Sequence, residues 1–460
     1  MTFTGLDQPG FDLERRRAEH THVLVVGPYL TERAMARQEG AANMRSPEAR
    51  LDEAAGLTRA IDLNVKGVIH APLSQIRPAT FLGTGKMEEI AERIKEDEID
   101  LAMMDCALSP VQQRNLEKAF GCKVIDRTGL ILEIFGRRAR TREGSLQVEL
   151  AHLAYQKSRL VRSWTHLERQ RGGFGFLGGP GETQIETDRR LIQERITRIE
   201  RELEGVKKTR GLHRQSRRDV PFPIVALVGY TNAGKSTLFN RMTRADVLAQ
   251  DMLFATLDPT LRAVRLPHGA KIMLSDTVGF ISDLPTMLVS AFRATLEEVI
   301  EADVILHVRD ISHEDSQAQS ADVATILRDL GIEPTDTQRL IEVWNKADLL
   351  NHEARDNLME AASRRGLEGR PQVVSAVSGE GIDALLGAIE ERLAHGRQLF
   401  DVSLSASDGE GLAWIYENVE VMQRSSDSEG GQKLVVRVPP ERVERLQRRF
   451  PGAIEAHYNA

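Results

Sequence analysis

The sequence has little cysteine and no long apolar run. Only Cys106 and Cys122 occur among its 460 residues, which argues against a disulfide scaffold and leaves no second cysteine pair for a zinc site. No stretch approaches the roughly 18 uncharged apolar residues that a membrane-spanning helix needs. Residues 1–20 lack an apolar signal segment, and we expect a flexible tail there. These absences favour a reducing cytoplasm, with peripheral attachment to membranes left open.

The length predicts several domains. At roughly 150 residues per domain the chain corresponds to about three, and its 41% hydrophobic residues suffice for several cores. The patterns described below predict an α/β protein with five parts after the tail. These parts are an N-terminal α/β domain (21–142), a long antiparallel helical hairpin (143–212), a linker (213–223), a mostly parallel sheet with helices on both faces (224–395) and a small C-terminal α/β domain (396–460).

The charge is unevenly distributed along the chain. The net charge is -7, yet residues 137–218 contain 20 Lys plus Arg against 10 Asp plus Glu. This segment is therefore +10 and the remainder is -17. A basic middle in an acidic protein is a candidate surface for a polyanion. The alternative is a pair of solvated helices whose charges only keep the protein soluble.

The N-terminal part alternates strand and helix patterns. Short apolar strands are expected at 22–26, 65–69 and 101–104. Ser109 and Pro110 predict the start of one helix. The Gly-Thr-Gly-Lys segment at 83–86 has two interpretations, a glycine turn that enters a helix or a phosphate-binding loop. The second is weaker, because the segment lacks the four intervening residues and the following Ser or Thr of a complete phosphate loop.

Two long runs of coiled-coil spacing follow. Apolar residues recur in a 4-3 rhythm over 146–167 and in a similar one over 185–206. Two such stripes bury each other most simply side by side, so we expect an antiparallel hairpin with the glycine-rich segment 171–182 at its tip. Exposed rings among glycines suit stacking on RNA, whereas a disordered spacer is the alternative. The candidate RNA contacts are Arg171, Phe174 and Phe176.

A complete phosphate-loop motif lies beyond the linker. A buried-type strand at 224–228 runs directly into G-Y-T-N-A-G-K-S-T at 229–237, and a helical pattern follows. The two glycines permit a tight backbone, and loop amides with a helix N-terminus suit phosphates. Lys235 is expected to reach the terminal phosphates and Ser236 to ligate Mg²⁺.

Three further motifs each follow a predicted strand: D-T-V-G at 276–279, N-K-A-D at 345–348 and S-A-V at 375–377. The Asp276 carboxylate suits the magnesium shell, and the Gly279 amide suits a γ-phosphate. Asp348 can accept hydrogen bonds from the ring N–H and exocyclic amine of guanine, which adenine does not present. The amides of the third motif are expected near the guanine carbonyl. Together these motifs predict a site for GTP and GDP with Mg²⁺.

The expected roles can be assigned residue by residue. The catalytic candidates are Lys235, Thr256 and Gly279, and the metal ligands are Ser236, Thr256 and Asp276. The expected nucleotide contacts are Gly229, Tyr230, Thr231, Asn232, Ala233, Gly234, Lys235, Ser236, Thr237, Phe254, Ala255, Thr256, Leu257, Asp258, Asp276, Thr277, Val278, Gly279, Asn345, Lys346, Ala347, Asp348, Ser375, Ala376 and Val377.

Three positions bear on hydrolysis. Thr256 is the expected switch threonine, with Thr260 as its rival. Phe280 stands where Ras-type enzymes carry the glutamine that orients water, so slow intrinsic hydrolysis is expected, with a partner or a cation supplying the missing stabilisation. Asn232 resembles the asparagine that holds K⁺ in some cation-activated GTPases, and a local turn former is the alternative.

The patterns in the C-terminal part predict a compact α/β domain and contain no motif that indicates its function. Strands are expected at 402–404 and 433–438, and helices at 410–422 and 440–450.

Taken together, the chain resembles the HflX family of ribosome-associated GTPases, within the translation-factor-related superfamily. The segments that carry the resemblance are 81–86, 108–116, 124–128, 146–150, 172–182 and 228–239. The resemblance implies a cytoplasmic monomer that hydrolyses GTP and binds the large ribosomal subunit and its rRNA, and it implies a role in splitting or rescuing stalled ribosomes. The basic segment agrees with an RNA partner. Two alternatives stay open, a GTP-switched ribosome assembly factor and a nucleotidase whose N-terminal domain also hydrolyses ATP.

Overall fold

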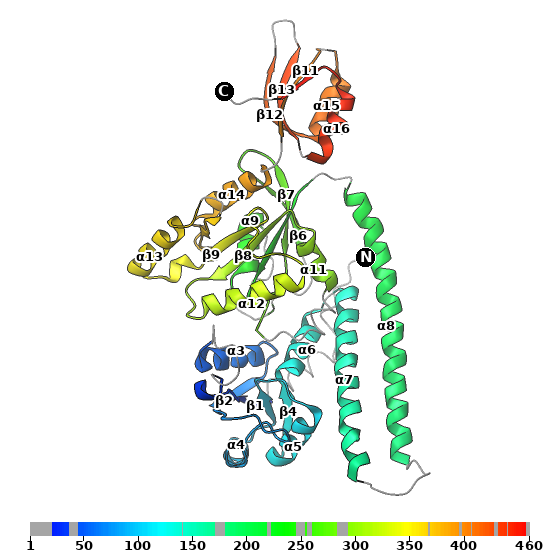
Figure 1. The fold of residues 1–460 in the computed structure, drawn as a ribbon, viewed down its shortest axis with the longest axis vertical. Helices are drawn as coiled ribbons and strands as arrows, with labels where there is room; N and C mark the ends of the chain where they lie inside the picture. Colours follow the sequence, from blue (N-terminus) through cyan, green and yellow to red (C-terminus); the bar gives the residue numbers. More distant parts are fainter. Residues whose placement is uncertain are drawn as a thin grey trace.

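The protein is built around three sheets arranged along its long axis, with a helical hairpin beside the lower two (Figure 1). The computed structural model describes residues 21–35, 45–139, 141–170, 180–218, 222–244, 254, 260–282, 293–366, 369–394, 398–405, 407–426, 431–438 and 440–456. The predicted tail 1–20 and the candidate RNA contacts Arg171, Phe174 and Phe176 lie outside these residues. Within them, no helix has both the length and the apolar composition to cross a membrane.

The N-terminal domain contains a four-stranded parallel sheet in the order β2-β1-β3-β4. Its strands are β1 (His22–Gly27), β2 (Asn64–His70), β3 (Leu101–Met104) and β4 (Lys123–Asp126). Its helices are α2 (Glu32–Met35), α3 (Pro47–Arg59), α4 (Thr84–Glu96), α5 (Pro110–Phe120) and α6 (Arg127–Arg138). The predicted helix start is confirmed, because the Ser109 hydroxyl accepts from the Gln112 amide and the Gln112 side chain returns a bond to the Ser109 amide.

The Gly-Thr-Gly-Lys segment at 83–86 forms the beginning of α4. Gly83 has an ordinary φ of -73° at the N-cap, and a Cβ at Gly83 or Gly85 would meet no atom within 4 Å. The Lys86 ammonium lies 2.6 Å from the Glu89 carboxylate. Neither a left-handed glycine nor a close backbone approach occurs here, so the geometry favours the glycine turn over the phosphate loop.

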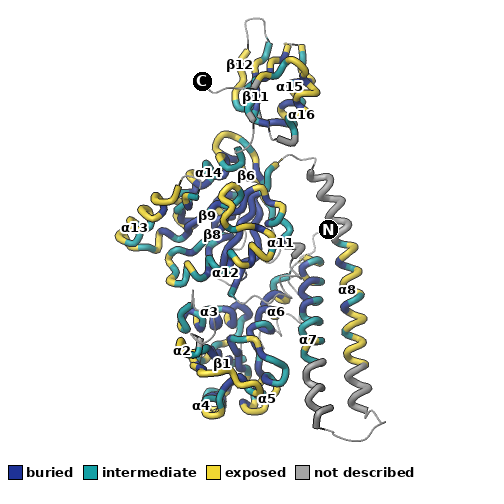
Figure 2. Tube along the Cα trace, viewed as in Figure 1, coloured by how far each residue is buried: buried dark blue, intermediate teal, exposed yellow. Residues whose placement is uncertain are grey.

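Two long helices, α7 (Arg142–Gln170) and α8 (Pro180–Arg218), form the predicted antiparallel hairpin and lie side by side in Figure 1. Val148 and Ala151 of α7 are buried, as are three residues of α8. These α8 residues are Ile196, Ile199 and Leu203. Elsewhere along the part of α8 whose burial is described, Figure 2 shows mostly exposed residues.

Both ends of α8 extend beyond the predicted hairpin. The helix begins at Pro180, inside the segment 171–182 expected to be a loop, and continues to Arg218, inside the predicted linker 213–223. Proline suits the first turn of a helix because its missing N–H has no helical partner there. Residues 213–218 are mostly Arg and Gln, which are good helix formers. Residues 213–218 therefore continue α8, and the linker interpretation of this part of 213–223 was wrong.

The central domain has a six-stranded sheet in the order β10-β9-β8-β5-β7-β6, in which only β6 is antiparallel. The strands are β5 (Ile224–Gly229), β6 (Thr260–Arg265), β7 (Lys271–Asp276), β8 (Val304–Asp310), β9 (Leu340–Asn345) and β10 (Gln372–Val373). The helices are α9 (Lys235–Thr243), α11 (Arg293–Ile300), α12 (Ser316–Asp329), η1 (Ala347–Leu349), α13 (His352–Ser363) and α14 (Ile382–Ala394). This mostly parallel sheet confirms the predicted fold class.

The two faces of the central sheet belong to different cores. Helices α9 and α14 pack on one face through residues such as Phe239 and Leu385. Helices α11 and α12 cover the other face, and their core is continuous with that of the N-terminal domain. The Phe135 ring of α6 meets the Phe254 ring edge-on at 4.7 Å between centroids. The two domains therefore share one apolar core.

The C-terminal domain contains an antiparallel sheet in the order β12-β13-β11-β14. Its elements are β11 (Gln398–Leu404), α15 (Gly409–Asn418), β12 (Glu420–Ser426), β13 (Gln432–Val438), α16 (Pro440–Arg449) and β14 (Ile454–Ala456). The helix predicted at 410–422 is wrong at its end, since residues from Glu420 onward pair with β13. Strand pairing at the tertiary level overrides the local helical pattern here.

Candidate functional site

The carboxyl ends of the central strands meet at one edge of the sheet, and the sequence motifs gather there. Strand β5 ends at Gly229, β7 at Asp276 and β9 at Asn345. In an open α/β sheet this edge is where ligands bind. The four predicted motifs therefore come together in space.

Two glycines allow the loop at 229–236 to approach its neighbours closely. A Cβ at Gly229 would lie 2.2 Å from the Val308 carbonyl oxygen, and a Cβ at Gly234 would lie 2.2 Å from Asn345 Nδ2. Gly234 also has a φ of 89° as the N-cap of α9. Any larger residue would clash with a backbone or a buried amide, so these positions require glycine.

Lys235 fills the inside of this loop. Its ammonium donates to the carbonyls of Gly229 at 3.1 Å and Tyr230 at 2.8 Å. The side chain is only 5% exposed, and this burial lowers the Lys235 pKa to about 8, although the charge of Asp276 opposes the shift. A buried, poorly compensated cation facing a loop of amides is suited to a multiply charged anion.

A hydroxyl and a carboxylate face each other beside the loop. The Ser236 hydroxyl donates to Asp276 Oδ2 at 2.7 Å, and Asp276 is fully buried at the end of β7. Oxygen donors of this kind are the ligands that Mg²⁺ takes in proteins. The residues present therefore fit a magnesium ion, which would be held by Ser236 and Asp276.

Gly279 and Phe280 follow this carboxylate and lie against the loop. A Cβ at Gly279 would be 3.1 Å from the Lys235 ammonium. The Phe280 ring is 1% exposed, its amide donates to the Gly229 carbonyl at 3.0 Å, and its own carbonyl accepts from Thr231 at 2.7 Å. Phe280 is therefore a core residue fixed to the loop, and its ring offers no polar atom to a water molecule.

Asn345 connects two of the motifs. Its side-chain amide donates to the Ala233 carbonyl at 2.8 Å, and its side-chain oxygen accepts from the Ala376 amide at 3.0 Å. The neighbouring Lys346 has a left-handed φ of 64° and forms an ion pair with Asp310 at 2.7 Å. Asp348, in contrast, is exposed. Asn345 thus holds the phosphate loop and the S-A-V loop in one arrangement.

The S-A-V loop uses part of its hydrogen-bonding capacity internally. The Ser375 amide donates to the Glu380 carbonyl, and the Ala376 amide donates to Asn345. Arg241 of α9 donates to the carbonyls of Ala376, at 3.1 Å, and Val377. Sequence reasoning missed Arg241, because nothing in the spacing of the motifs links α9 to this loop.

Several expected contacts lie elsewhere or outside the described residues. Tyr230 directs its hydroxyl to the N-terminal domain, and Phe254 packs on Phe135. Thr260 opens β6 opposite Asp276. Asn232 is exposed with a left-handed φ of 60°, a conformation that asparagine tolerates well. The switch candidates outside the described residues are Ala255, Thr256, Leu257 and Asp258.

A buried polar cluster, which sequence reasoning missed entirely, joins the phosphate loop to the N-terminal domain. The Tyr230 hydroxyl donates to Glu53 at 2.5 Å and contacts the Ser282 hydroxyl at 2.7 Å. Arg45 donates to both hydroxyls at 3.0 Å and pairs with Glu53 at 2.8 Å. Arg127 also pairs with Glu53 and donates to the Ser282 carbonyl at 3.1 Å. We refer to Arg45, Glu53, Arg127, Tyr230 and Ser282 as the interdomain cluster.

The charges of the interdomain cluster compensate one another. Burial opposes the positive charge of Arg127, but the carboxylates of Asp105 and Glu53 outweigh it, so its pKa lies well above the usual value. Burial and the charge of Glu53 raise the pKa of Tyr230. Tyr230 therefore stays protonated and acts as a donor to Glu53.

Comparison with known proteins decides the family. The chain is 52% identical over 397 residues to a GTPase HflX of Magnetococcus marinus, covering 86% of this chain and 90% of that protein. It is 44% identical over 407 residues to the GTPase HflX of Escherichia coli, covering 88% of this chain and 93% of that one. The chain belongs to the HflX family of GTPases. It is accordingly a GTP-binding protein that hydrolyses GTP, and the family depends on Mg²⁺ in general.

The domains match the family part by part. Residues 48–136 match the GTP-binding GTPase N-terminal description, and residues 138–217 match the GTP-binding GTPase middle region. Residues 224–346 match the description 50S ribosome-binding GTPase, and residues 362–458 match the HflX C-terminal domain. The matches thus reach all three sheets and the hairpin of this HflX-family protein, while β1 precedes the first matched residue.

The buried Lys235 predicts an unusual dependence of stability on pH. The unfolded chain keeps this lysine protonated to about pH 10, whereas the nucleotide-free folded protein releases the proton near pH 8. Between these values the unfolded state binds more protons, so the free energy of unfolding should rise with pH. Relative to Lys235→Met, the wild type should gain about 2 kcal/mol between pH 8 and pH 10 in urea denaturation. If the free energies of unfolding of the two proteins changed with pH in parallel, the lowered pKa of Lys235 would be contradicted.

The interdomain cluster predicts strong coupling between two residues far apart in sequence. Tyr230→Phe and Glu53→Gln should each lower the free energy of unfolding by about 1–3 kcal/mol, because each leaves buried polar groups with fewer partners. The double variant should lose about 1–2 kcal/mol less than the sum of the single losses, measured by urea denaturation of the full chain. As a control, the exposed Tyr416 changed to Phe should combine additively with Glu53→Gln. If both double variants were additive, the hydrogen bond between Tyr230 and Glu53 would contribute nothing to the free energy of unfolding.

Proposed function

We propose that this HflX-family protein binds GTP at the edge formed by β5, β7 and β9. The loop at 229–237 would hold the phosphates through its amides and the N-terminus of α9, with Lys235 at the terminal phosphates. The depressed pKa of Lys235 supports this role, because a multiply charged anion would compensate the buried ammonium and raise this pKa again. The Gly279 amide, beside the Lys235 ammonium, would meet the γ-phosphate.

Magnesium would be held by Ser236 and Asp276, with Thr256 as a further candidate ligand. When bound, the ion would neutralise charge that develops on the phosphate oxygens during hydrolysis. The 2.7 Å contact between the Ser236 hydroxyl and Asp276 supports this assignment, since both oxygens already converge on one point.

Asp348 and the S-A-V loop would recognise the guanine base of the nucleotide. Asp348 is exposed at the site edge, and its carboxylate can accept from the two N–H groups that distinguish guanine from adenine. The Val377 amide is the loop donor that has no partner among the described residues, so it is the one suited to the guanine carbonyl. Arg241 and Asn345 would keep this loop in position.

The guanine assignment predicts a change of base preference. Asp348→Asn presents a donor where the wild type has only acceptors, so GTP affinity should fall about 10- to 100-fold, and affinity for the xanthine nucleotide should rise. Titration of both nucleotides into wild type and variant measures this. Asp303→Asn, whose acid caps the start of β5 far from the site edge, is a matched control that should leave both affinities unchanged. Unaltered GTP binding by Asp348→Asn would refute the guanine pocket.

We further propose that the protein associates with the large ribosomal subunit in the cytoplasm and splits or rescues stalled ribosomes. The observation that carries this is the interdomain cluster. Because Ser282 follows the D-T-V-G motif and is held by Arg45 and Arg127, any nucleotide-driven movement there must change the contacts of the N-terminal domain. The family description 50S ribosome-binding GTPase and the +10 charge of residues 137–218 support rRNA as the partner.

Hydrolysis should depend strongly on this partner. Since Phe280 has no polar atom with which to orient water, turnover by the isolated monomer should be slow, and large subunits should raise it by about tenfold or more. Phosphate release with and without subunits measures this, and equal rates would contradict it. Sedimentation of mature ribosomes with a non-hydrolysable GTP analogue separates the functions: dissociated subunits support splitting, whereas intact ribosomes favour the assembly factor.

Potassium is the proposed cation that supplements hydrolysis, acting through Asn232. The exposed left-handed position of Asn232 leaves its side-chain oxygen available beside the phosphate loop. Replacing Na⁺ with K⁺ should raise the GTPase rate of the wild type by about tenfold and leave Asn232→Ala unaffected. Asn232→Asp serves as a control that keeps the oxygen. Equal rates of wild-type hydrolysis in the two salts would assign Asn232 to turn formation alone.

A further inference from the structure

The S-A-V loop of the proposed guanine site is closed by hydrogen bonds of its own. The Ser375 amide donates to the Glu380 carbonyl at 3.0 Å, and the Ser375 carbonyl accepts from the Gly379 amide at 2.8 Å. The Ser378 amide donates to the Ser375 hydroxyl at 3.0 Å. Since Ser375 is fully buried, the start of the loop is fixed from within, whereas the next two peptide units are held by a different element.

That element is helix α9, through Arg241. Its Nε donates to the Ala376 carbonyl at 3.1 Å, and a terminal nitrogen of the same guanidinium donates to the Val377 carbonyl. Helix α9 is fixed relative to the loop, because Phe239 and Ala376 belong to one buried apolar core. The guanidinium also lies beside Gly379, where a Cβ would be 3.6 Å from Arg241 Cζ. One planar group thus sets the orientation of two successive peptide units.

The orientation of the first peptide unit decides where an amide points. A trans peptide is planar, and its C=O and N–H groups point in opposite directions. The Ala376 carbonyl and the Val377 amide belong to one such unit. Because this carbonyl points to Arg241, the Val377 N–H points away from Arg241, and it has no hydrogen-bond partner among the described residues. Arg241 therefore determines the direction in which the Val377 N–H can meet a ligand.

Among the amides from 375 to 378, that of Val377 is available to a ligand. The Ala376 amide donates to Asn345 Oδ1 at 3.0 Å. The amides of Ser375 and Ser378 bond within the loop. Val377 is 68% exposed, so it lies at the surface. An N–H needs an acceptor, and guanine has a carbonyl oxygen at position 6, where adenine carries an amine. A Val377 N–H of fixed direction therefore favours guanine.

We propose that Arg241 is a positioning residue for guanine recognition, which aims the Val377 amide at the 6-oxygen of the base by holding the Ala376 carbonyl behind it. The inference rests on the guanine site proposed above and adds a residue that acts through the loop rather than on the nucleotide. Without the guanidinium, the peptide unit is free to turn, and its amide is aimed correctly in only a fraction of the molecules. The apparent affinity falls by that fraction.

The test compares nucleotides that differ at the atom in question. 6-Thio-GDP keeps the ring N–H and the exocyclic amine of GDP but has sulfur, a weak acceptor, in place of the 6-oxygen. IDP keeps the 6-oxygen and lacks the exocyclic amine. Each is titrated into the full chain by calorimetry. Arg241→Gln should weaken binding of GDP and of IDP by about tenfold, and binding of 6-thio-GDP by no more than about twofold.

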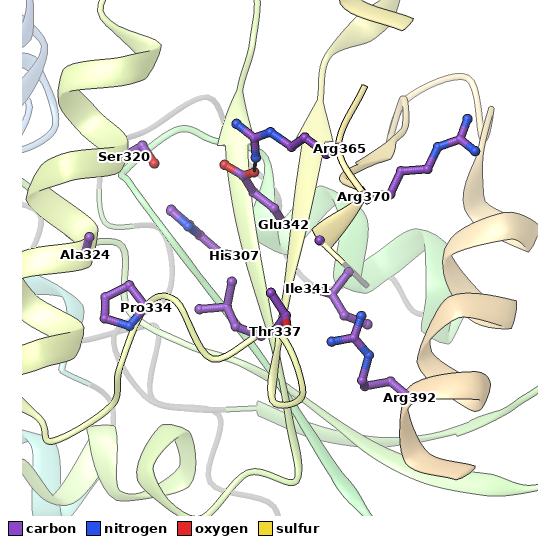
Figure 3. A pocket seen from close by; sticks show the side chains of 12 residues that line it. His307, Ser320, Ala324, Pro334, Thr337, Ile341, Glu342, Arg365, Arg370 and Arg392 are labelled. Atoms are coloured by element: carbon purple, nitrogen blue, oxygen red, sulfur yellow. Dashed lines mark hydrogen bonds and ion pairs between the residues drawn. The ribbon is translucent and has the colours of Figure 1, made fainter. Parts of the chain in front are cut away.

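Two other arginines serve as controls for the loss of a guanidinium. Arg355 of α13 contacts the same loop through an exposed ion pair with Glu380, and such pairs contribute little. Arg365 faces Glu342 in Figure 3 and is paired with it near the beginning of β9, whereas the nucleotide site lies at the end of that strand. Arg355→Gln and Arg365→Gln should each change GDP affinity by no more than about twofold.

A conservative variant and the sulfur analogue separate positioning from a general loss of structure. Arg241→Lys keeps the charge but not the planar fork, so its GDP affinity should lie between those of wild type and Arg241→Gln. A loosened domain would weaken all three nucleotides equally, and that result overturns the proposal. Unchanged GDP binding by Arg241→Gln also overturns it. If Asp348→Asn then still weakens GDP binding, the guanine site stands without Arg241. If neither variant weakens GDP binding, the guanine site itself is wrong.

Discussion

The carboxylate of Glu53 is the point on which the arrangement of the two larger domains depends. It lies between two arginines of its own domain and the Tyr230 hydroxyl of the phosphate loop. Both ion pairs would survive separation of the domains, but Glu53 would lose the Tyr230 donor and the buried charges would have to be rehydrated. The position of the N-terminal domain and the position of the loop are therefore linked. A change at the phosphate loop therefore affects the N-terminal domain, and a change at the N-terminal domain affects the loop by the same free energy.

Phe280 determines where the segment after the D-T-V-G motif can begin to move. Its ring is in the core shared by the two domains, and both of its backbone polar groups bond to the phosphate loop. The next described polar anchor is Ser282, whose amide and hydroxyl bond to Tyr230 and whose carbonyl bonds to Arg127. A rearrangement that frees Ser282 can leave Phe280 in place. Phe280 is thus fixed to the phosphate loop through both of its backbone polar groups.

Sequence reasoning succeeded where the determining interactions are local. The phosphate loop needs a strand, two glycines and a helix start within a dozen residues, and each of these can be recognised in order along the sequence. Strand β8 carries no motif and was not anticipated, because its burial depends on neighbours distant in sequence. The bond between Tyr230 and Glu53 joins positions 177 residues apart, and no periodicity reports such a pairing. The prediction for the basic end of α8 was wrong for a different reason, since a polar, basic composition fits a helix as well as a linker.

Helix α8 connects the far end of the hairpin to the first strand of the GTPase sheet. Its 39 residues correspond to about 58 Å at 1.5 Å per residue, and only five residues separate Arg218 from the start of β5 at Ile224. Because α8 is long, a small rotation at one end produces a large displacement at the other. A tilt of about 5° about its C-terminal end would sweep its other end through about 5 Å, roughly the rise of one helical turn. Small adjustments around β5 can therefore become displacements at the hairpin tip that are large enough to exchange one set of contacts for another.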